Sequence, residues 1–276
     1  MDSIDTTAEA MADWWRTSIT DMKPGEIRMR GYPIEELIGA ISFPAMIWLM
    51  LRGELPTKAQ AELLSAALVA AVDHGPQAPS IAVARMAATC GVGLNSAMAS
   101  AINALGDVHG GAGQQAMALY ESVLARTGSA DDLVQAAHDE VAERLSAGKM
   151  IEGFGHRFHP VDPRAPRLLA LVEQAKSEQV VTGCYAQIGL AVEAALAQLK
   201  NRHLPMNIDG ATAVVYAELG FQPALGRGLF VLSRSVGILA HAWEQTEQGA
   251  RIKGPVPPSV DYAYDGPSVR HLEGNS

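Results

Sequence analysis

Aromatic side chains are scarce in this chain of 276 residues: phenylalanine, tryptophan and tyrosine make up 5% of it, although 48% of the residues are hydrophobic. A core must therefore be built from alanine, leucine, valine, isoleucine and methionine, several of which are strong helix formers. A chain of this length can bury one large core or two modest ones. The composition predicts a protein built from closely packed helices.

Cysteine is equally scarce, and its spacing is uninformative. Cys90 and Cys184 stand in apolar or small-residue surroundings and form no CxxC pair. We expect two reduced, packed thiols. The sequence also lacks paired histidines at ligand spacing, a phosphate-binding loop and a GxSxG motif. It therefore predicts neither a metal centre nor a serine nucleophile.

Positive charge is in short supply, since 21 lysines and arginines face 30 acids for a net charge of −9. This balance argues against a nucleic-acid partner. Long hydrophobic runs are missing too: segments 41–51 and 229–240 are too short or too interrupted to span a bilayer. The first residues carry acids instead of the basic start of a signal peptide. We expect a soluble cytoplasmic protein with no membrane partner.

Helical patterns dominate the chain, and alternation typical of a strand is confined to 26–32. Residues 1–24 are expected to form a short helix or arm, and the proline-rich tail 251–276 an extended arm. The Gly91–Gly93 pair predicts a kink or a close helix contact. The predicted helices are 34–40, 42–51, 57–72, 79–104, 114–127, 131–147, 166–178, 181–201 and 223–246.

Four candidate site residues stand at breaks between helices: His74, His109 and His156 beside a glycine, and Asp209 just before one. Histidine can carry or release a proton near neutral pH. Asp209 lacks charged neighbours in sequence and precedes an apolar helix. It is either an N-cap, or a base whose pKa is raised by burial, or both.

Three arginines are isolated in weakly charged surroundings: Arg85, Arg164 and Arg234. Arg234 lies inside an apolar run, which is typical of a buried salt bridge or of an anionic ligand. His241 follows it at i+7, on roughly the same helix face. If histidines, carboxylate and arginines converge, the site suits proton abstraction beside a carbonyl, with a carboxylate-bearing substrate held by arginine.

Five motifs occur in the order found in the citrate synthase family, which this sequence resembles from about residue 25 to 265: GEIRMRGYPIEELI, ALGDVHGGAGQQAM, KMIEGFGHRFHPVDPRAPRLL, PMNIDG and LFVLSRSVGILAHAWEQ. The GFGHR…DPR stretch is the most specific. The resemblance implies an all-α, two-domain fold and a homodimer or higher oligomer. It places a large domain at 1–111 and 223–276, and a small closing domain at 112–222.

The resemblance also implies roles for the catalytic residues. His109 matches the histidine that stabilises the acetyl-CoA enol, and His156 the one that hydrogen-bonds the oxaloacetate carbonyl. Asp209 matches the base that takes the methyl proton. No metal and no covalently bound cofactor is implied, because coenzyme A enters as a thioester substrate.

Binding residues follow from the same resemblance. His74, Arg164 and Arg234 match residues that hold the oxaloacetate carboxylates. The remaining matches concern coenzyme A: the backbone of Gly153, Phe154 and Gly155 lies against the adenine, and Arg157 or Lys149 takes the phosphate.

The chain differs from ordinary citrate synthases in being shorter and in its segment Asp73-His74-Gly75-Pro76. In both respects it resembles citryl-CoA lyase and the C-terminal lyase module of ATP-citrate lyase more closely. We therefore favour cleavage of citryl-CoA to acetyl-CoA and oxaloacetate through an enolate. The alternatives are a citrate or 2-methylcitrate synthase and a catalytically silent CoA-binding homologue. Where the family usually has Arg-Pro the chain reads Lys253-Gly254-Pro255, so Lys253 or Arg251 is the candidate replacement.

Overall fold

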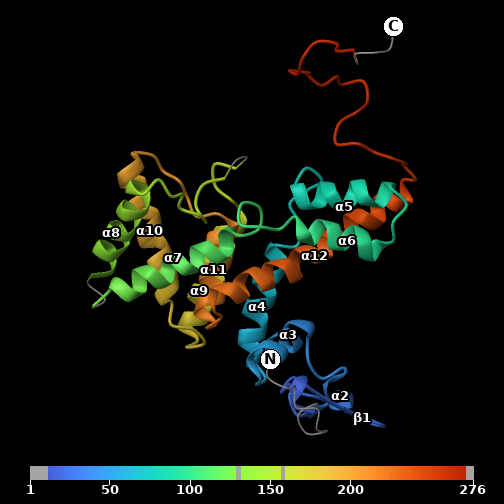
Figure 1. The fold of residues 1–276 in the computed structure, drawn as a ribbon. Helices are drawn as coiled ribbons and strands as arrows, with labels where there is room; N and C mark the ends of the chain where they lie inside the picture. The colour runs from blue at the N-terminus through green and yellow to red at the C-terminus, as the bar shows by residue number, and fades with distance from the viewer. Residues whose placement is uncertain (1–11, 129–131, 157–158, 272–276) are drawn as a thin grey trace, which may run out of the picture. The chain divides into compact units, whose positions relative to one another are not determined.

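The computed structural model describes residues 12–128, 132–156 and 159–271, most of them in helices (Figure 1). The chain divides into two compact units. Unit 1 comprises Met1–Val72 and Gly110–Ser233, and unit 2 comprises Asp73–His109 and Arg234–Ser276. The large and small domains expected from the resemblance remain predictions.

The helices of unit 1 are α2 (Ile34–Leu37), α3 (Phe43–Arg52), α4 (Lys58–Ala70), α7 (Ala112–Arg126), α8 (Leu133–Ser146), α9 (Arg164–Ser177), α10 (Cys184–Lys200), α11 (Ile208–Glu218) and the first part of α12 (Pro223–Glu247). Those of unit 2 are α5 (Pro79–Thr89), α6 (Leu94–Asn103) and the rest of α12. The all-α class predicted from the composition is confirmed. Most predicted boundaries lie within a few residues of these, but α2 is shorter than the predicted helix over 34–40, and residue 131 lies outside the described residues.

A small antiparallel sheet precedes the helices, in the order β1 (Thr20–Lys23), β2 (Glu26–Met29) and β3 (Tyr32–Pro33). The strand predicted within 26–32 is confirmed. The helix or arm expected through residue 24 is wrong for β1, whose side chains are mostly exposed. With almost no buried face, β1 has no hydrophobic alternation to reveal it; backbone pairing to β2 makes it a strand.

Local capping explains where α3 and α4 begin. The Ser42 side chain accepts a hydrogen bond from the Ala45 N–H. Thr57 and Gln60 form a reciprocal capping box, which satisfies two backbone donors at the start of α4.

The central helix of unit 1 is α11, whose residues are nearly all buried and which packs against α4, α7, α9 and α10 (Figure 1). Its last residue, Glu218, accepts backbone N–H bonds from the start of α10, at Gly183, Tyr185 and Ala186. A carboxylate is favoured at a helix N-terminus. The C-terminal end of α11 is thereby anchored to α10.

Unit 2 is a small helical assembly in which α5 and α6 lie side by side against α12 (Figure 1). Its core is rich in alanine, with Ala84, Ala97 and Ala101 packed against Ile238 and Ala242, so the helices approach closely. The single helix predicted over 79–104 is wrong, because the chain ends one helix at Thr89 and starts another at Leu94.

Residues 251–271 are exposed and form no helix or strand, as expected for an extended arm. Cys90 is exposed, which corrects the expectation of a packed thiol, and Cys184 is half-buried. Among the described residues, no helix is both long and apolar enough to cross a membrane.

Candidate active site

The glycine-rich loop of unit 1 is bonded to the segment that leads into α11. The Asn207 N–H donates to the Gly153 carbonyl at 2.9 Å, and the Asn207 side-chain amide donates to the Gly155 carbonyl at 2.7 Å. His156 directly follows this loop, and Asp209 lies in the first turn of α11. Two predicted catalytic residues are therefore carried by segments that are bonded to each other.

Gly153 is required by close packing as well as by its backbone conformation. Its φ is +92°, and a Cβ at this position would lie 2.9 Å from Gly210 Cα and 3.1 Å from Ala116 Cβ. Such a φ is rarely adopted by residues with a side chain. The loop can lie against α11 and α7 only because this residue is glycine.

The N-cap of α11 is Asn207, not Asp209. Asn207 Oδ1 accepts from the N–H groups of Asp209 and Gly210, at 2.9 and 3.2 Å. Of the alternatives for Asp209, the N-cap is therefore wrong. Its half-buried carboxylate lies in the positive field of the helix N-terminus. Burial, and then the Asp209 charge, raises the pKa of the buried Tyr216.

Asp162 connects this helix to the predicted carboxylate-binding arginine. Its side chain is inaccessible to solvent and forms a forked pair with Arg164, with Nε and Nη2 each 2.9 Å from a carboxylate oxygen. It also accepts the N–H of Arg164 and, at 3.0 Å, that of Ile208. Burial alone would raise the pKa of Asp162, but the bonds from Arg164 and Ile208 lower it. A charged carboxylate thus fixes Arg164 beside the residue that precedes Asp209.

His156 has its ring orientation set by the backbone. Its Nδ1 accepts the His159 N–H at 3.1 Å, so in the neutral ring the proton sits on Nε2 and can be donated. Burial lowers the pKa of His156; the nearby Asp162 opposes this, and His159 and Arg164 reinforce it. The ring is therefore a neutral hydrogen-bond donor at physiological pH. Arg157, the predicted phosphate ligand, lies outside the described residues.

In unit 2, His109 acts as the cap of α5. Its Nε2 accepts the Ser80 N–H at 3.1 Å and lies 3.0 Å from the Ser80 hydroxyl, while the N-cap residue Ala78 offers no side-chain oxygen. The neutral ring then carries its proton on Nδ1. Burial, and next the charge of Arg234, lowers the pKa of His109. His109 is thus also a neutral donor, through the opposite ring nitrogen.

The arginines of unit 2 differ from each other. Arg234 is only 5% exposed, and its charge reaches His109. Arg85 pairs with Glu244 and lies 3.0 Å from His241 Nδ1. These contacts account for the position of Arg85 without a ligand. From the sequence, Arg85 was one of the three isolated arginines considered for anion binding.

His74 occupies a turn held by its neighbour, because Asp73 Oδ2 accepts the Gly75 N–H at 3.0 Å. Taken together, each unit carries a share of the predicted residues. Unit 1 holds Gly153, Phe154, Gly155, His156, Arg164 and Asp209; unit 2 holds His74, His109 and Arg234.

Three positioning residues escaped prediction from the sequence: Ser80, Asp162 and Asn207. Asn207 had a detectable pattern, as a good N-cap residue just before an apolar helix. Asp162 sits in the most specific motif, two residues before Arg164, yet its bond to Ile208 spans 46 positions. Ser80 contacts His109 through its backbone N–H as well as its hydroxyl, and a backbone donor is not revealed by the sequence.

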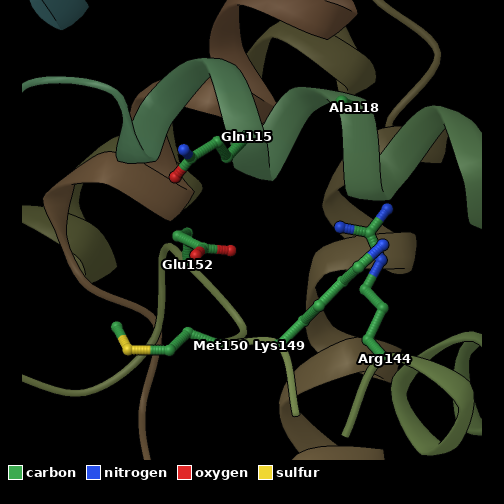
Figure 2. A pocket seen from close by; sticks show the side chains of 6 residues that line it. All are labelled: Gln115, Ala118, Arg144, Lys149, Met150 and Glu152. Atoms are coloured by element: carbon green, nitrogen blue, oxygen red, sulfur yellow. The ribbon is translucent and has the colours of Figure 1, made fainter. Parts of the chain in front are cut away.

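A cavity of about 400 Å³ lies beside the glycine-rich loop, between α7, α8 and residues 149–152. Figure 2 shows the Lys149 amine and the Arg144 guanidinium close together below Ala118, with Gln115 and Glu152 on the other side. Arg144 is held in place by the buried Glu140 at 2.7 Å. Because Arg144 is already paired, Lys149 is the stronger candidate to attract an anion here.

Comparison with known proteins decides the family. The chain matches the model of the citrate synthase C-terminal domain over residues 8–65 and 57–255. It belongs to the citrate synthase family. It is 31% identical to a citrate synthase of Haloferax volcanii over 226 residues, covering 81% of this chain and 57% of that protein. Citrate synthase 2 of Bacillus subtilis is 31% identical over 214 residues, covering 77% of this chain and 53% of that protein. The chain thus spans little more than half the length of these relatives.

Solved structures of the family share the fold. The citryl-CoA lyase from Hydrogenobacter thermophilus superposes with a TM-score of 0.83 and 33% identity, covering 94% of this chain and 97% of that one. The ATP citrate lyase from Methanothrix soehngenii, in complex with citrate and coenzyme A, has a TM-score of 0.77 over 96% of this chain and 45% of that one. At 23% identity, this second match supports the fold alone. The predicted family and its citrate-synthase-like helical fold are confirmed.

Proposed function

We propose that this protein is a citryl-CoA lyase, which cleaves citryl-CoA to acetyl-CoA and oxaloacetate. The observation that carries the proposal is structural likeness: the citryl-CoA lyase from Hydrogenobacter thermophilus superposes on 94% of this chain with a TM-score of 0.83 at 33% identity. The chain also keeps the histidines and the aspartate expected for the family, which suit the same carbon chemistry run towards cleavage.

The proposed reaction uses two neutral imidazoles and one acid. The citryl hydroxyl loses its proton to solvent while the His156 Nε2–H supports the oxygen that becomes the oxaloacetate carbonyl. The carbon–carbon bond breaks and leaves its electron pair on the acetyl fragment as an enolate, whose oxygen takes a hydrogen bond from the His109 Nδ1–H. Protonated Asp209 then delivers a proton to the enolate carbon, which gives acetyl-CoA.

Coenzyme A would occupy the cavity beside the glycine-rich loop. The Gly153–Gly155 backbone is proposed to lie against the adenine, and Lys149 to hold a phosphate group, with Arg157 as the other candidate. In support, Lys149 lines a cavity of about 400 Å³ together with the side chain of Met150, which offers apolar surface to a base.

The dicarboxylate part of the substrate is assigned to His74, Arg164 and Arg234. Arg164 and Arg234 have restricted side chains, one by the Asp162 fork and the other by burial. Arginines held in this way lose little freedom on binding a carboxylate, so recognition is more favourable.

We also propose a homodimer. On α12 the side chains of Val236, Leu239 and Trp243 recur at helical spacing and are 58%, 41% and 52% exposed. An exposed apolar stripe of this kind is typical of a helix that packs against a partner. Lys253, the candidate replacement for a family arginine, points its amine at Gln245 of its own chain, at 3.4 Å.

A product assay tests the activity. Purified protein is incubated with citryl-CoA, and oxaloacetate, acetyl-CoA and free citrate are measured over time. The proposal expects equal amounts of oxaloacetate and acetyl-CoA with little citrate. Asp209→Asn should lower kcat by at least about a hundredfold and leave the circular dichroism spectrum unchanged. Asp139→Asn, which changes an exposed carboxylate of α8, is the control.

A citrate synthase is the second candidate, favoured by the 31% identical relatives that carry that name. Release of mainly citrate and CoA in the same assay would support it, and a 2-methylcitrate synthase would prefer propionyl-CoA. If no acyl-CoA and 2-oxo acid pair reacts, while CoA still binds, the catalytically silent homologue is the better description.

A further inference from the structure

His241, on α12, lies between an acid and a base that both belong to unit 2. Its Nε2 is 3.2 Å from Asp73 Oδ1, and its Nδ1 is 3.0 Å from Arg85 Nη1. Arginine can only donate, so Nδ1 must be the acceptor. The proton of the neutral ring therefore sits on Nε2, facing the Asp73 carboxylate.

Arg85 is held firmly enough to impose this tautomer. It pairs with the Glu244 carboxylate and donates to Gln248 Oε1 at 3.0 Å, and its side chain is 14% exposed. Glu244 lies on α12 and Gln248 directly follows that helix, so α5 and α12 together fix the position of the His241 ring.

Asp73 connects the fixed His241 ring to the turn that contains His74. One carboxylate oxygen faces His241 of α12, and the other accepts the Gly75 N–H at 3.0 Å across His74, so a single side chain contacts both α12 and the turn. Burial alone would raise the pKa of Asp73, but the Gly75 N–H and the His241 contact lower it. The carboxylate stays charged and keeps both contacts.

We propose that His241 is a positioning residue that acts through Asp73 on His74. It ties the His74 turn to α12, the helix that carries Arg234 two turns earlier. His74 and Arg234, two of the three residues assigned to the substrate carboxylates, are thereby both positioned by α12. The inference rests on the proposed function in so far as His74 binds a dicarboxylate.

The test measures the binding of each half of the substrate separately, by calorimetric titration of the full chain with oxaloacetate and with coenzyme A. We expect His241→Ala to weaken oxaloacetate binding about tenfold, because Asp73 loses its contact with His241 Nε2, and to leave coenzyme A binding unchanged. His241→Gln, whose amide N–H replaces Nε2–H, should restore most of the affinity; His241→Asn, too short to reach Asp73, should not. Glu247→Gln, an exposed change on the same helix, is the control.

A double-mutant cycle separates positioning from a general loss of structure. If His241 acts through His74, His241→Ala has no further effect on oxaloacetate binding in a His74→Ala background. Equal losses of affinity in both backgrounds would overturn the inference. So would a parallel loss of coenzyme A affinity, or a failure of Gln to restore what Asn does not. If the alanine variant does not fold, the Gln and Asn pair carries the test.

The outcomes also separate this inference from the proposed function. A wild-type chain that binds oxaloacetate and shows the coupling, but does not cleave citryl-CoA, supports His241 as a positioning residue and refutes the lyase. A chain that cleaves citryl-CoA while His241→Ala leaves oxaloacetate affinity unchanged refutes the positioning role alone. A wild-type chain that binds no oxaloacetate refutes both.

Discussion

Replacing Asp162 by asparagine is the sharpest single test of how unit 1 is held together. The substitution keeps the shape of the side chain and removes its charge. In the native protein one carboxylate oxygen accepts the Arg164 N–H and Nε–H, and the other accepts the Arg164 Nη2–H and the Ile208 N–H. An asparagine has one oxygen, so whichever way its amide is turned, two of the four donors face an NH₂ group.

The expected cost follows from that count. A hydrogen bond to a charged group contributes about 1.5–3 kcal/mol, and a buried donor left without an acceptor costs a similar amount. Because the Arg164 side chain is 25% exposed, water compensates part of the loss. We therefore expect the free energy of unfolding to fall by about 3 kcal/mol. A loss of that size is a large fraction of the stability of a typical domain.

Urea unfolding followed by circular dichroism measures the change, with Asp139→Asn as the exposed control. The pH dependence adds an independent check. The pKa of Asp162 is lowered in the folded state, so the unfolded chain binds more protons in acid. The stabilisation is complete above about pH 4, the unfolded pKa of an aspartate, and is lost as pH falls through the folded pKa. The difference in unfolding free energy between wild type and Asp162→Asn should therefore become smaller below about pH 4.

A change in unfolding free energy no greater than that of Asp139→Asn would refute the reasoning. Arg164 would then keep its place through other contacts, and the link from the carboxylate to α11 would have no energetic weight. A difference in unfolding free energy between the two proteins that stays constant in acid would show that the loss does not come from the charge of Asp162.

Three further outcomes are expected. Gly153→Ala should lower the free energy of unfolding, measured in urea, by about 2 kcal/mol more than Gly39→Ala does. Both glycines have a positive φ, but of the two only Gly153 would bring a Cβ against backbone, at 2.9 Å. Equal losses of unfolding free energy would contradict a close approach. Lys149→Ala should weaken coenzyme A binding about tenfold and leave binding of an acyl-pantetheine unchanged, with the exposed Lys200→Ala as control; an equal effect on both ligands would place the phosphate elsewhere. Since the pKa of His109 and of His156 is lowered, both rings stay neutral to lower pH than usual, so kcat/KM should fall only below about pH 6.5; a fall that begins at higher pH would contradict neutral rings.

Local features of the fold could be predicted from the sequence because their causes are local. Ser42 caps α3 through an atom three residues away, and Gly53 ends that helix with a φ of 89°. Both depend on residue types at short spacing. The pair Gly91 and Gly93 was correctly singled out, but whether such a pair bends a helix or breaks it depends on the packing of α5 and α6.

The reactive side chains of the candidate site could be predicted from the sequence, but the groups that orient them could not. His109, His156 and Asp209 stand out because reactive side chains occur beside glycines at helix breaks. The groups that orient them are distant in sequence: Ser80 lies 29 positions from His109, and Ile208 lies 46 from Asp162. In both contacts a backbone N–H donates to a side chain, and a backbone donor leaves no residue preference for a sequence to display. Tertiary structure was needed to find them.

The backbone contacts of the two histidines indicate which residues stabilise oxygen and which residue moves a proton in the proposed reaction. A neutral imidazole has one N–H and one lone pair, and in each ring the lone pair is already used, by Ser80 at His109 Nε2 and by His159 at His156 Nδ1. Each ring therefore offers substrate a donor and no base. Of the three predicted catalytic residues, Asp209, in the first turn of α11, alone is left to exchange a proton with carbon. Substituting either histidine should thus impair stabilisation of oxygen, while exchange of the acetyl-CoA methyl protons with deuterated water, followed by NMR, should depend most steeply on Asp209.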